Sequence, residues 1–243
     1  MTDTDEAKSG ADDAGEAKAP RTASRADRRE QLIEATIEVL AEHGLSRTKL
    51  GEVAARAGVA HGLVNFHFRS KEILLSETLV YLSEEYRQNW TEALARVPAK
   101  DPAGQLDALI RADFSPPVFT PARLAAWCAF WGEAQSRPMY QAQCGSNDRA
   151  YIELMERICA RLAAAGRYGI DARRAARVLR VTVEGTWLDL ITMTEPYSRD
   201  EAEATVFTCA AAFFPKHFTP RGRRGAPAGP RPMPGGRQGP GGA

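Results

Sequence analysis

The sequence has few of the features that mark secreted, metal-binding or membrane-spanning proteins. Its 243 residues include four cysteines without a C-x-x-C pair, which argues against a zinc site or a disulfide framework. No run of about 18 apolar residues is present for a membrane span, and the acidic first twenty residues do not resemble a secretory signal. No nucleotide, metal or covalent-nucleophile motif occurs. We therefore expect a cytoplasmic protein with no cofactor, no membrane partner and no enzymatic activity.

Strand-like alternation of apolar and polar residues is also scarce, so the pattern predicts an all-α protein. Apolar residues recur at helical spacing, and prolines and glycines separate the segments. Beyond the first seventy residues, the expected helices cover residues 70–96, 103–113, 121–136, 139–165, 171–195 and 199–217.

Two short helices joined by a glycine turn are predicted between Thr48 and Lys71. Thr48 can cap the first helix, whose apolar residues recur at helical spacing up to Ala57. Gly58 ends that helix because glycine enters the left-handed backbone region without a Cβ penalty. A second helix over residues 61–68 follows. Such a pair is either a helix-turn-helix that binds DNA or an ordinary corner between two helices.

The flanking segments favour DNA binding. A helix over residues 28–44 precedes the pair and ends at Gly44, and a long helix capped by Ser70 follows it. The chain here resembles the TetR family of bacterial regulators, whose signature is a Thr followed by A-x-x-A-G-V-S-x-G-x-x-Y-x-H-F-x-x-K. Matching positions are Thr48, Ala54, Ala57, Gly58, Val59, Gly62, His67, Phe68 and Lys71. The chain departs from the signature at Ala60, where the family has Ser, and at Asn65, where it has Tyr.

This resemblance implies an N-terminal helix-turn-helix domain and a helical C-terminal domain for ligand binding and dimerisation. We expect Thr48 and Lys71 to contact phosphates, and His61 and Asn65 to contact base edges. Gly62 would allow close approach to DNA. The full set of expected DNA-binding residues is Thr48, His61, Gly62, Asn65, Phe66, His67 and Lys71.

Within TetR, the chain is similar to the choline-responsive repressors of the betaine pathway. Those show A-W-x-A-F-W, Q-P-M and D-G-x-W-L where this chain has residues 126–131, 137–139 and 185–188. Several aromatic faces select an organic cation, each contributing about 0.5–2 kcal/mol. The expected ligand-binding residues are Trp127, Phe130, Trp131, Tyr140, Tyr151, Met155, Glu184 and Trp187, with Glu133 and Asp189 as further sources of negative charge. The same aromatic stripe is equally typical of a helix that lies in a protein core.

Charge and composition divide the chain into four parts: a disordered tail over 1–24, a DNA-binding domain over 25–71, a ligand-binding and dimerisation domain over 72–218, and a disordered tail over 219–243 rich in Gly, Pro and Arg. Residues 21–71 carry nine Lys or Arg against six acids, whereas residues 72–219 carry sixteen against nineteen. A basic head on an acidic body suits a DNA-binding module attached to a sensor. The C-terminal arginines either attract phosphates or form a solvated extension.

The sequence thus predicts a homodimeric repressor that binds a palindromic operator and is released by a small effector, such as a choline-like organic cation. The last two expected helices carry more apolar residues than one bundle face requires, and in TetR proteins this pair forms the dimer interface. A neutral hydrophobic effector is the first alternative. A helical enzyme and a ligand-independent DNA-binding protein are the others; turnover of the ligand would indicate the former, and a lack of operator preference the latter.

Overall fold

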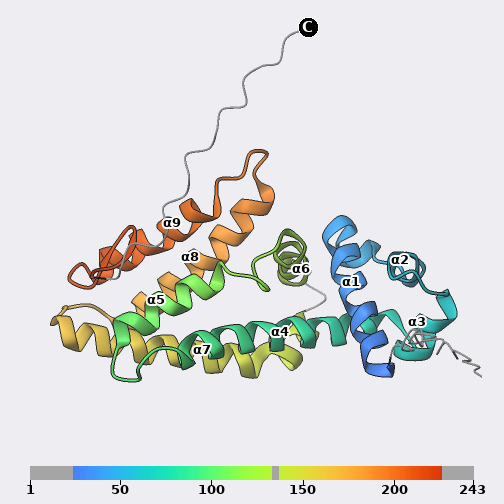
Figure 1. Cartoon of the computed structure of the whole chain (residues 1–243), viewed down its shortest axis with the longest axis horizontal. Helices are drawn as coiled ribbons and strands as arrows, with labels where there is room; N and C mark the ends of the chain where they lie inside the picture. Colours follow the sequence, from blue (N-terminus) through green and yellow to red (C-terminus); the bar gives the residue numbers. More distant parts are fainter. Residues whose placement is uncertain (1–23, 133–136, 226–243) are drawn as a thin grey trace, which may run out of the picture.

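The structure is a computed structural model that describes residues 24–132 and 137–225, and these fold into helices and one short hairpin (Figure 1). A small N-terminal domain holds α1 (Arg25–Arg47), α2 (Leu50–Arg56) and α3 (His61–Phe68). The larger domain contains α4 (Lys71–Ala95), α5 (Pro102–Asp113), α6 (Pro121–Gly132), α7 (Arg137–Gly166), α8 (Ala172–Thr192) and α9 (Arg199–Phe213). Strands β1 (Phe218–Thr219) and β2 (Gly222–Arg223) pair antiparallel. The predicted all-α fold with two domains is confirmed.

Helix α1 begins and ends where its sequence favours it. Ser24 Oγ accepts a hydrogen bond from the Asp27 amide at 3.1 Å, and Asp27 Oδ2 accepts one from the Ser24 amide at 2.9 Å, which forms a capping box. Gly44, at φ 74°, interrupts the helical backbone as predicted, and one further turn leads to Arg47. The inward face of α1 is buried, with Leu32, Ile37 and Leu40 at its centre.

Helix α4 connects the two domains, running from α3 along the larger domain (Figure 1). Ser70 caps it, as expected, by accepting a hydrogen bond from the Ile73 amide at 3.3 Å. Arg29 of α1 pairs with Glu77 of α4 and donates to the His67 carbonyl at 2.8 Å. One guanidinium therefore holds α1, the end of α3 and the start of α4 together.

Helix α6 lies against α1 and α8, between the two domains (Figure 1). Its Arg123 side chain is 15% exposed and pairs with Glu34 of α1 and Glu85 of α4, each at 2.8 Å. Trp127 and Trp131 follow Arg123 at successive four-residue steps on the same helix. The tryptophans of the larger domain and the arginine that contacts the N-terminal domain thus share one helix.

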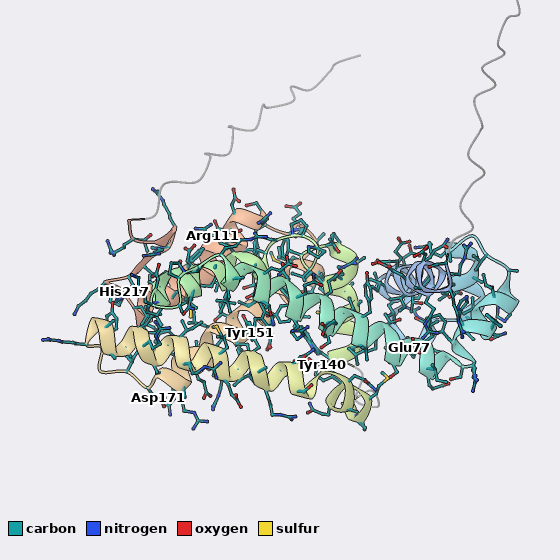
Figure 2. All side chains as sticks on the ribbon, turned by 60° about the horizontal axis from the view of Figure 1, so that its bottom comes forward. Glu77, Arg111, Tyr140, Tyr151, Asp171 and His217 are labelled. Atoms are coloured by element: carbon teal, nitrogen blue, oxygen red, sulfur yellow. The ribbon has the colours of Figure 1, made fainter. Side chains whose placement is uncertain are left out.

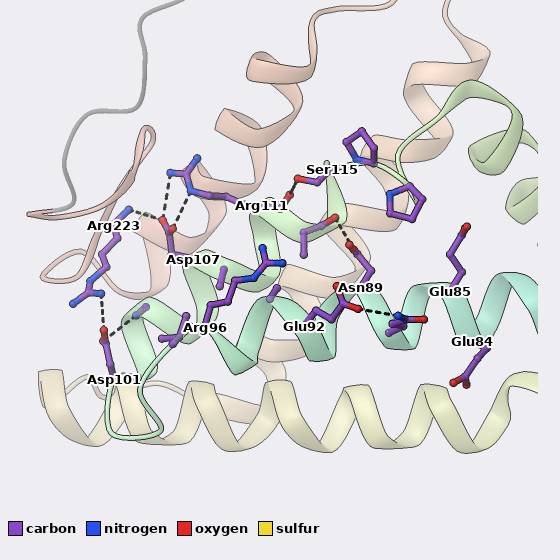
Figure 3. Close-up of a pocket in the computed structure, with 18 of the residues that line it drawn as sticks. Glu84, Glu85, Asn89, Glu92, Arg96, Asp101, Asp107, Arg111, Ser115 and Arg223 are labelled. Atoms are coloured by element: carbon purple, nitrogen blue, oxygen red, sulfur yellow. Dashed lines mark hydrogen bonds and ion pairs between the residues drawn. The ribbon is translucent and has the colours of Figure 1, made fainter. Parts of the chain in front are cut away.

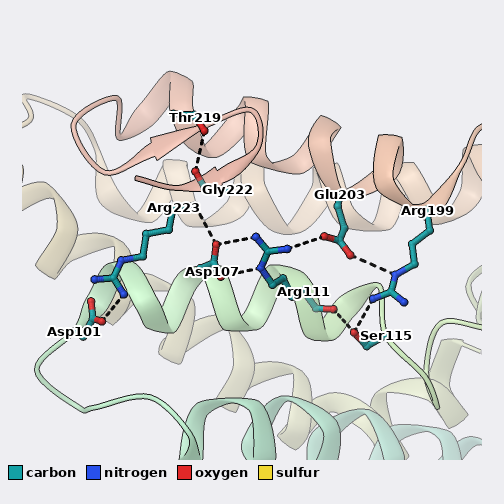
Figure 4. Close-up of polar contacts among 9 residues, drawn as sticks. All are labelled: Asp101, Asp107, Arg111, Ser115, Arg199, Glu203, Thr219, Gly222 and Arg223. Atoms are coloured by element: carbon teal, nitrogen blue, oxygen red, sulfur yellow. Dashed lines mark hydrogen bonds and ion pairs between the residues drawn. The ribbon is translucent and has the colours of Figure 1, made fainter. Parts of the chain in front are cut away.

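The C-terminal tail was expected to be disordered from residue 219, and that expectation is wrong at its start. Phe218 is 1% exposed, and its ring stacks on that of Phe207 with the centroids 6.3 Å apart. Arg223 pairs with Asp101 at 2.6 Å, and its amide donates to Asp107 Oδ1 at 3.1 Å (Figure 4). Apolar contact and charge pairing therefore hold the hairpin on α5 and α9.

Several helix ends also differ from the predicted ones. Helix α9 ends at Phe213 rather than at residue 217, because the chain turns into the hairpin. Helix α8 spans residues 172–192 instead of 171–195, and α7 begins at residue 137 instead of 139. Helix α6 is described as far as Gly132, so Glu133 lies outside the described residues.

Candidate functional site

The predicted helix-turn-helix is present in α2 and α3. Gly58, at φ 65°, forms the turn between the helices, and the Val59 amide donates to the Ala54 carbonyl at 3.0 Å. Val53 of α2 and Val64 of α3 are completely buried between the helices. The turn thus presents the opposite face of α3 to solvent.

The exposed face of α3 carries four of the seven predicted DNA-binding residues: His61, Gly62, Asn65 and Phe66. The Phe66 ring is 66% exposed, and the Arg25 guanidinium lies 5.7 Å from its centroid. A Cβ atom built on Gly62 would meet no atom of the chain within 4 Å, so internal packing does not require glycine here. The absence of a side chain instead leaves room for a partner to approach the backbone.

Two of the predicted DNA-binding residues point into the protein. Thr48 is 1% exposed, and its hydroxyl donates to the Gly44 carbonyl at 2.8 Å. Lys49, not Thr48, is the N-cap of α2. His67 is 8% exposed, and burial, followed by repulsion from the Arg29 charge, lowers the pKa of its imidazole. We therefore remove both side chains from the DNA-contacting set.

Lys71, the first residue of α4, is half-buried, between the exposed residues of α3 and the two that point inward. Its Nζ atom donates to the Ser46 carbonyl at 2.9 Å and so fixes the segment that leads into α2. An ammonium has three donors, so this contact leaves two for other acceptors.

A cavity of about 400 Å³ lies within the larger domain, bounded by α4, α5, α6, α7 and α8. Figure 2 shows two of its residues, Tyr140 and Tyr151, along α7. Six of the eight predicted ligand-binding residues line it: Trp127, Trp131, Tyr140, Tyr151, Glu184 and Trp187.

The other two predicted ligand-binding residues do not line this cavity. Phe130 is 1% exposed and belongs to the hydrophobic core. Met155 lies one turn beyond Tyr151 on α7, where it lines a separate cavity of about 180 Å³. Asp189 is solvent-exposed and does not line the cavity either. Helical spacing placed these side chains near the aromatic residues, but it did not determine which of them border empty space.

The aromatic side chains form a continuous wall. The Trp131 ring stacks between Trp127 and Trp187, with centroid distances of 5.8 and 6.4 Å. Tyr86 meets the edges of Trp127 at 6.4 Å and of Trp187 at 6.1 Å. Trp131 is 37% exposed whereas its two neighbours are buried, so it lies at the mouth of the cavity. The negative faces of these rings suit a cation.

A buried carboxyl group, Asp113, forms the floor of the cavity. It is 1% exposed and accepts hydrogen bonds from the hydroxyls of Tyr86 at 2.9 Å and Tyr151 at 3.2 Å. Burial raises the pKa of Asp113 to about 7, the two hydrogen bonds oppose that rise, and the Glu184 charge adds to it. A cation beside this group would favour its ionised form.

Asp148 and Arg180 also line the cavity. Burial raises the pKa of Asp148, which is hydrogen-bonded to Tyr140. Arg180 forms an ion pair with Glu184 one turn later on α8. Sequence patterns missed Tyr86, Asp113, Asp148 and Arg180; the available signal was Asp113, an acidic residue on the apolar face of α5.

One buried donor in the cavity wall lacks a partner. Trp187 Nε1 has no hydrogen-bond acceptor among the described residues, and the residue is 3% exposed. An unpaired buried N–H group costs about 1–3 kcal/mol, so a ligand or water oxygen here would stabilise the site.

A larger cavity, about 930 Å³, follows α4 and α5 on another side of the domain (Figure 3). Several of its charged groups already form ion pairs. Asp107 accepts from Arg111 at 2.9 Å, and Arg111 also contacts Glu203 at 3.1 Å (Figure 4). The aromatic cavity fits a small organic ligand better, because its walls are mostly apolar and aromatic and a few polar groups converge on it.

Two family models match the chain. The model described as "Bacterial regulatory proteins, tetR family" matches residues 32–78, and that described as "BetI-type transcriptional repressor, C-terminal" matches residues 102–215. The HTH-type transcriptional regulator BetI of Yersinia pestis (strain Pestoides F) is 30% identical over 191 residues, which cover 75% of this chain and 90% of that protein.

Solved structures share the fold. A putative transcriptional regulator from Pseudomonas aeruginosa PAO1 superposes with a TM-score of 0.65 at 26% identity, covering 78% of this chain and 91% of its own. A putative transcriptional regulator from Saccharomonospora viridis, solved in complex with choline, gives a TM-score of 0.65 at 17% identity and covers 75% of this chain and 94% of its own.

Proposed function

Because the chain belongs to the TetR family and carries a BetI-type C-terminal domain, we propose that it is a dimeric repressor released from its operator by an organic cation. Family membership makes it a DNA-binding transcriptional regulator rather than an enzyme. No described helix is long and apolar enough to cross a membrane. The operator, the dimer and the effector are the parts we propose.

DNA recognition is assigned to the exposed face of α3. Asn65 can bind adenine through two hydrogen bonds, and His61 can donate to a guanine or a phosphate. Phe66 offers apolar contact to a thymine methyl group. Lys71 contributes a phosphate contact through the donors that Ser46 leaves free.

The dimer interface is assigned to α8 and α9. Val178, Val181 and Leu188 are 39%, 51% and 50% exposed and recur at helical spacing on α8. Gly185 lies on the same face, and a Cβ atom there would meet nothing within 4 Å, so a second helix could approach closely. Most of the other apolar residues of the two helices, among them Leu179 and Phe207, pack within the subunit. Two copies joined here would present two recognition helices to a palindrome.

The effector assignment rests on one observation: an aromatic cavity that also holds carboxyl groups. Stacked indoles supply negative ring faces, and Asp113 supplies charge at the floor. Choline bound to the S. viridis regulator, which shares the fold, supports this choice. Trp187 Nε1 would donate to a ligand hydroxyl. A neutral hydrophobic effector is the second candidate, and the buried Asp113 disfavours it because no charge would compensate its ionised form.

Release follows if the ligand binds the two conformations of the dimer with different affinities. Helix α6 is the expected connection, since Trp127 and Trp131 line the cavity and Arg123 contacts α1. A shift of α6 on binding would change the position of α1 and the spacing of the recognition helices. The ligand could therefore release the operator without touching the DNA-binding domain.

Selection of operator sequences by the purified protein, followed by choline titration, tests the proposal. The protein should select a palindrome and release it as choline is added. Asn65→Ala should relax base preference at one position in each half-site, costing about 1–3 kcal/mol there. Lys71→Ala should weaken binding to all sequences and reduce the salt dependence. A selected site without symmetry, or binding that ignores sequence, would contradict the assignment and support the ligand-independent alternative.

A further inference from the structure

The aromatic cavity contains more negative than positive charge. Three carboxyl groups line it, Asp113 from α5, Asp148 from α7 and Glu184 from α8. One cationic group, Arg180, lines it as well and is paired with Glu184. Arg180 and Arg149 both attract Asp148, but Arg180 is already paired with Glu184, and Arg149 is solvent-exposed, so water and salt screen its charge. Three carboxyl groups therefore share one cationic group within the cavity, and neither Asp113 nor Asp148 forms an ion pair among the described residues.

These two groups occupy different depths. Asp113 is 1% exposed and is held by the hydroxyls of Tyr86 and Tyr151. Asp148 is half-buried and is held by Tyr140 instead. The Glu184 charge acts on both, and its own side chain is 38% exposed. The cavity thus has an acidic floor and an acidic mouth with aromatic walls.

A ligand with one positive charge would leave the charge of one of these two carboxyl groups, Asp113 or Asp148, uncompensated. An unpaired carboxylate in a water-poor site is costly and tends to take up a proton. The cavity volume, about 400 Å³, is also in the range that holds drug-sized ligands, larger than a single alkylammonium head. Volume and charge together favour an elongated ligand with a second cation.

We infer that the effector carries two cationic centres joined by an apolar chain, one beside Asp113 at the floor and the other beside Asp148 at the mouth. This inference rests on the proposed cation-binding function and specifies the class of cation. The aromatic wall would contact the connecting chain and the inner cation. An α,ω-diamine is the simplest member of the class.

The experiment compares cadaverine with the amino alcohol of the same chain length, which keeps one ammonium and replaces the other by a hydroxyl. Binding to the full-length protein is measured by calorimetry and by release of the operator. We expect cadaverine to bind at least about tenfold more tightly, a difference of about 1.4 kcal/mol. Putrescine serves as a shorter probe of the distance between the centres. Equal affinity of cadaverine and the amino alcohol would overturn the inference.

Variants locate the second centre. Asp148→Asn should weaken cadaverine binding more than binding of the amino alcohol and so remove most of the preference for cadaverine. Arg180→Gln should increase the preference, because it frees Glu184. Glu153→Gln, an exposed change on the same helix as Asp148, is the control and should change neither affinity. If the preference for cadaverine persists in Asp148→Asn, the second cation does not bind beside Asp148 and this part of the inference is wrong.

The outcomes separate this inference from the proposed function. If choline and the amino alcohol release the operator as well as cadaverine does, the cation-responsive repressor stands and the two-centre inference fails. If no cation binds while a neutral apolar compound releases the operator, both fail. Intact operator binding and a normal unfolding transition in every variant show that the protein is folded.

Discussion

The Tyr86 hydroxyl of α4 lies 2.9 Å from Asp113 Oδ1 of α5, which joins two helices at the floor of the aromatic cavity. Tyr151 of α7 donates to the second oxygen of the same carboxyl group. Three helices are therefore linked through one acidic side chain. A group placed there is sensitive both to what occupies the cavity and to how the helices pack.

The position of Asp113 predicts that cation affinity depends on pH. Burial raises the pKa of this carboxyl group to about 7, and the groups that face it are Tyr86, Tyr151 and Glu184. A cation prefers the ionised form, so affinity should be highest above pH 7 and should fall by up to about tenfold per unit as the pH drops below it. Calorimetric titrations from pH 5.5 to 8.5 measure this slope. Asp113→Asn should bind more weakly above pH 7 and should lose most of the slope; a wild-type profile that is flat in this range would contradict the prediction.

Trp131→Leu should weaken cation binding more than it weakens the fold. The ring is 37% exposed at the cavity mouth, and leucine keeps apolar bulk there but removes the negative ring face. We expect a loss of about 0.5–2 kcal/mol in choline affinity. Tryptophan fluorescence and operator release report binding, and thermal unfolding reports stability. The neutral carbon isostere of choline is the control ligand, and it should lose less affinity than choline does.

Arg123→Met should uncouple the cavity from the DNA-binding domain. Methionine keeps the aliphatic length but leaves Glu34 and the mostly buried Glu85 without their partner. Stability should fall by roughly 1–3 kcal/mol, since the pair is only partly exposed. Choline should still bind, yet saturating choline should release less operator than it does from the wild type. Arg87→Met, which breaks an exposed pair with Glu84, is the control and should cost less than about 1 kcal/mol.

Val181→Glu should yield a folded monomer. The side chain is 51% exposed on the outer face of α8, so a charge there disturbs nothing within the subunit but would be desolvated in an α8–α9 dimer interface. Sedimentation should give a monomer at micromolar concentration, with weakened operator binding. Val80→Glu, 42% exposed on α4, provides the matched control and should remain dimeric. A monomeric wild type would refute the dimer itself.

Local sequence patterns predicted the helices well because helical spacing, caps and glycine turns are local properties. Ser70, Gly44 and Gly58 each act where their chemistry predicts. The direction of a single side chain is harder to predict, because adjacent residues on a helix differ by about 100° around its axis. Phe66 is exposed and His67 is buried for this reason, although the sequence pattern grouped them together.

The floor of the cavity could not be predicted from local patterns. Asp113 meets Tyr86 and Tyr151 from positions 27 and 38 residues away, and no periodicity within one helix encodes that meeting. The hairpin was missed for a related reason. Its strands have two residues each, too few for an alternating pattern, and they lie in a segment rich in glycine and arginine.

The pairing of Arg223 with Asp101 sets a practical limit on how far the chain can be shortened. These residues are 122 positions apart, and a Cβ atom on Gly104 would come within 2.8 Å of the Arg223 guanidinium, so α5 accommodates this contact closely. Trimming the chain at residue 218 would leave Asp101 without the arginine and would strip the hairpin from the seam between α5 and α9. A shortened chain that is to keep this contact should therefore retain residues 219–225.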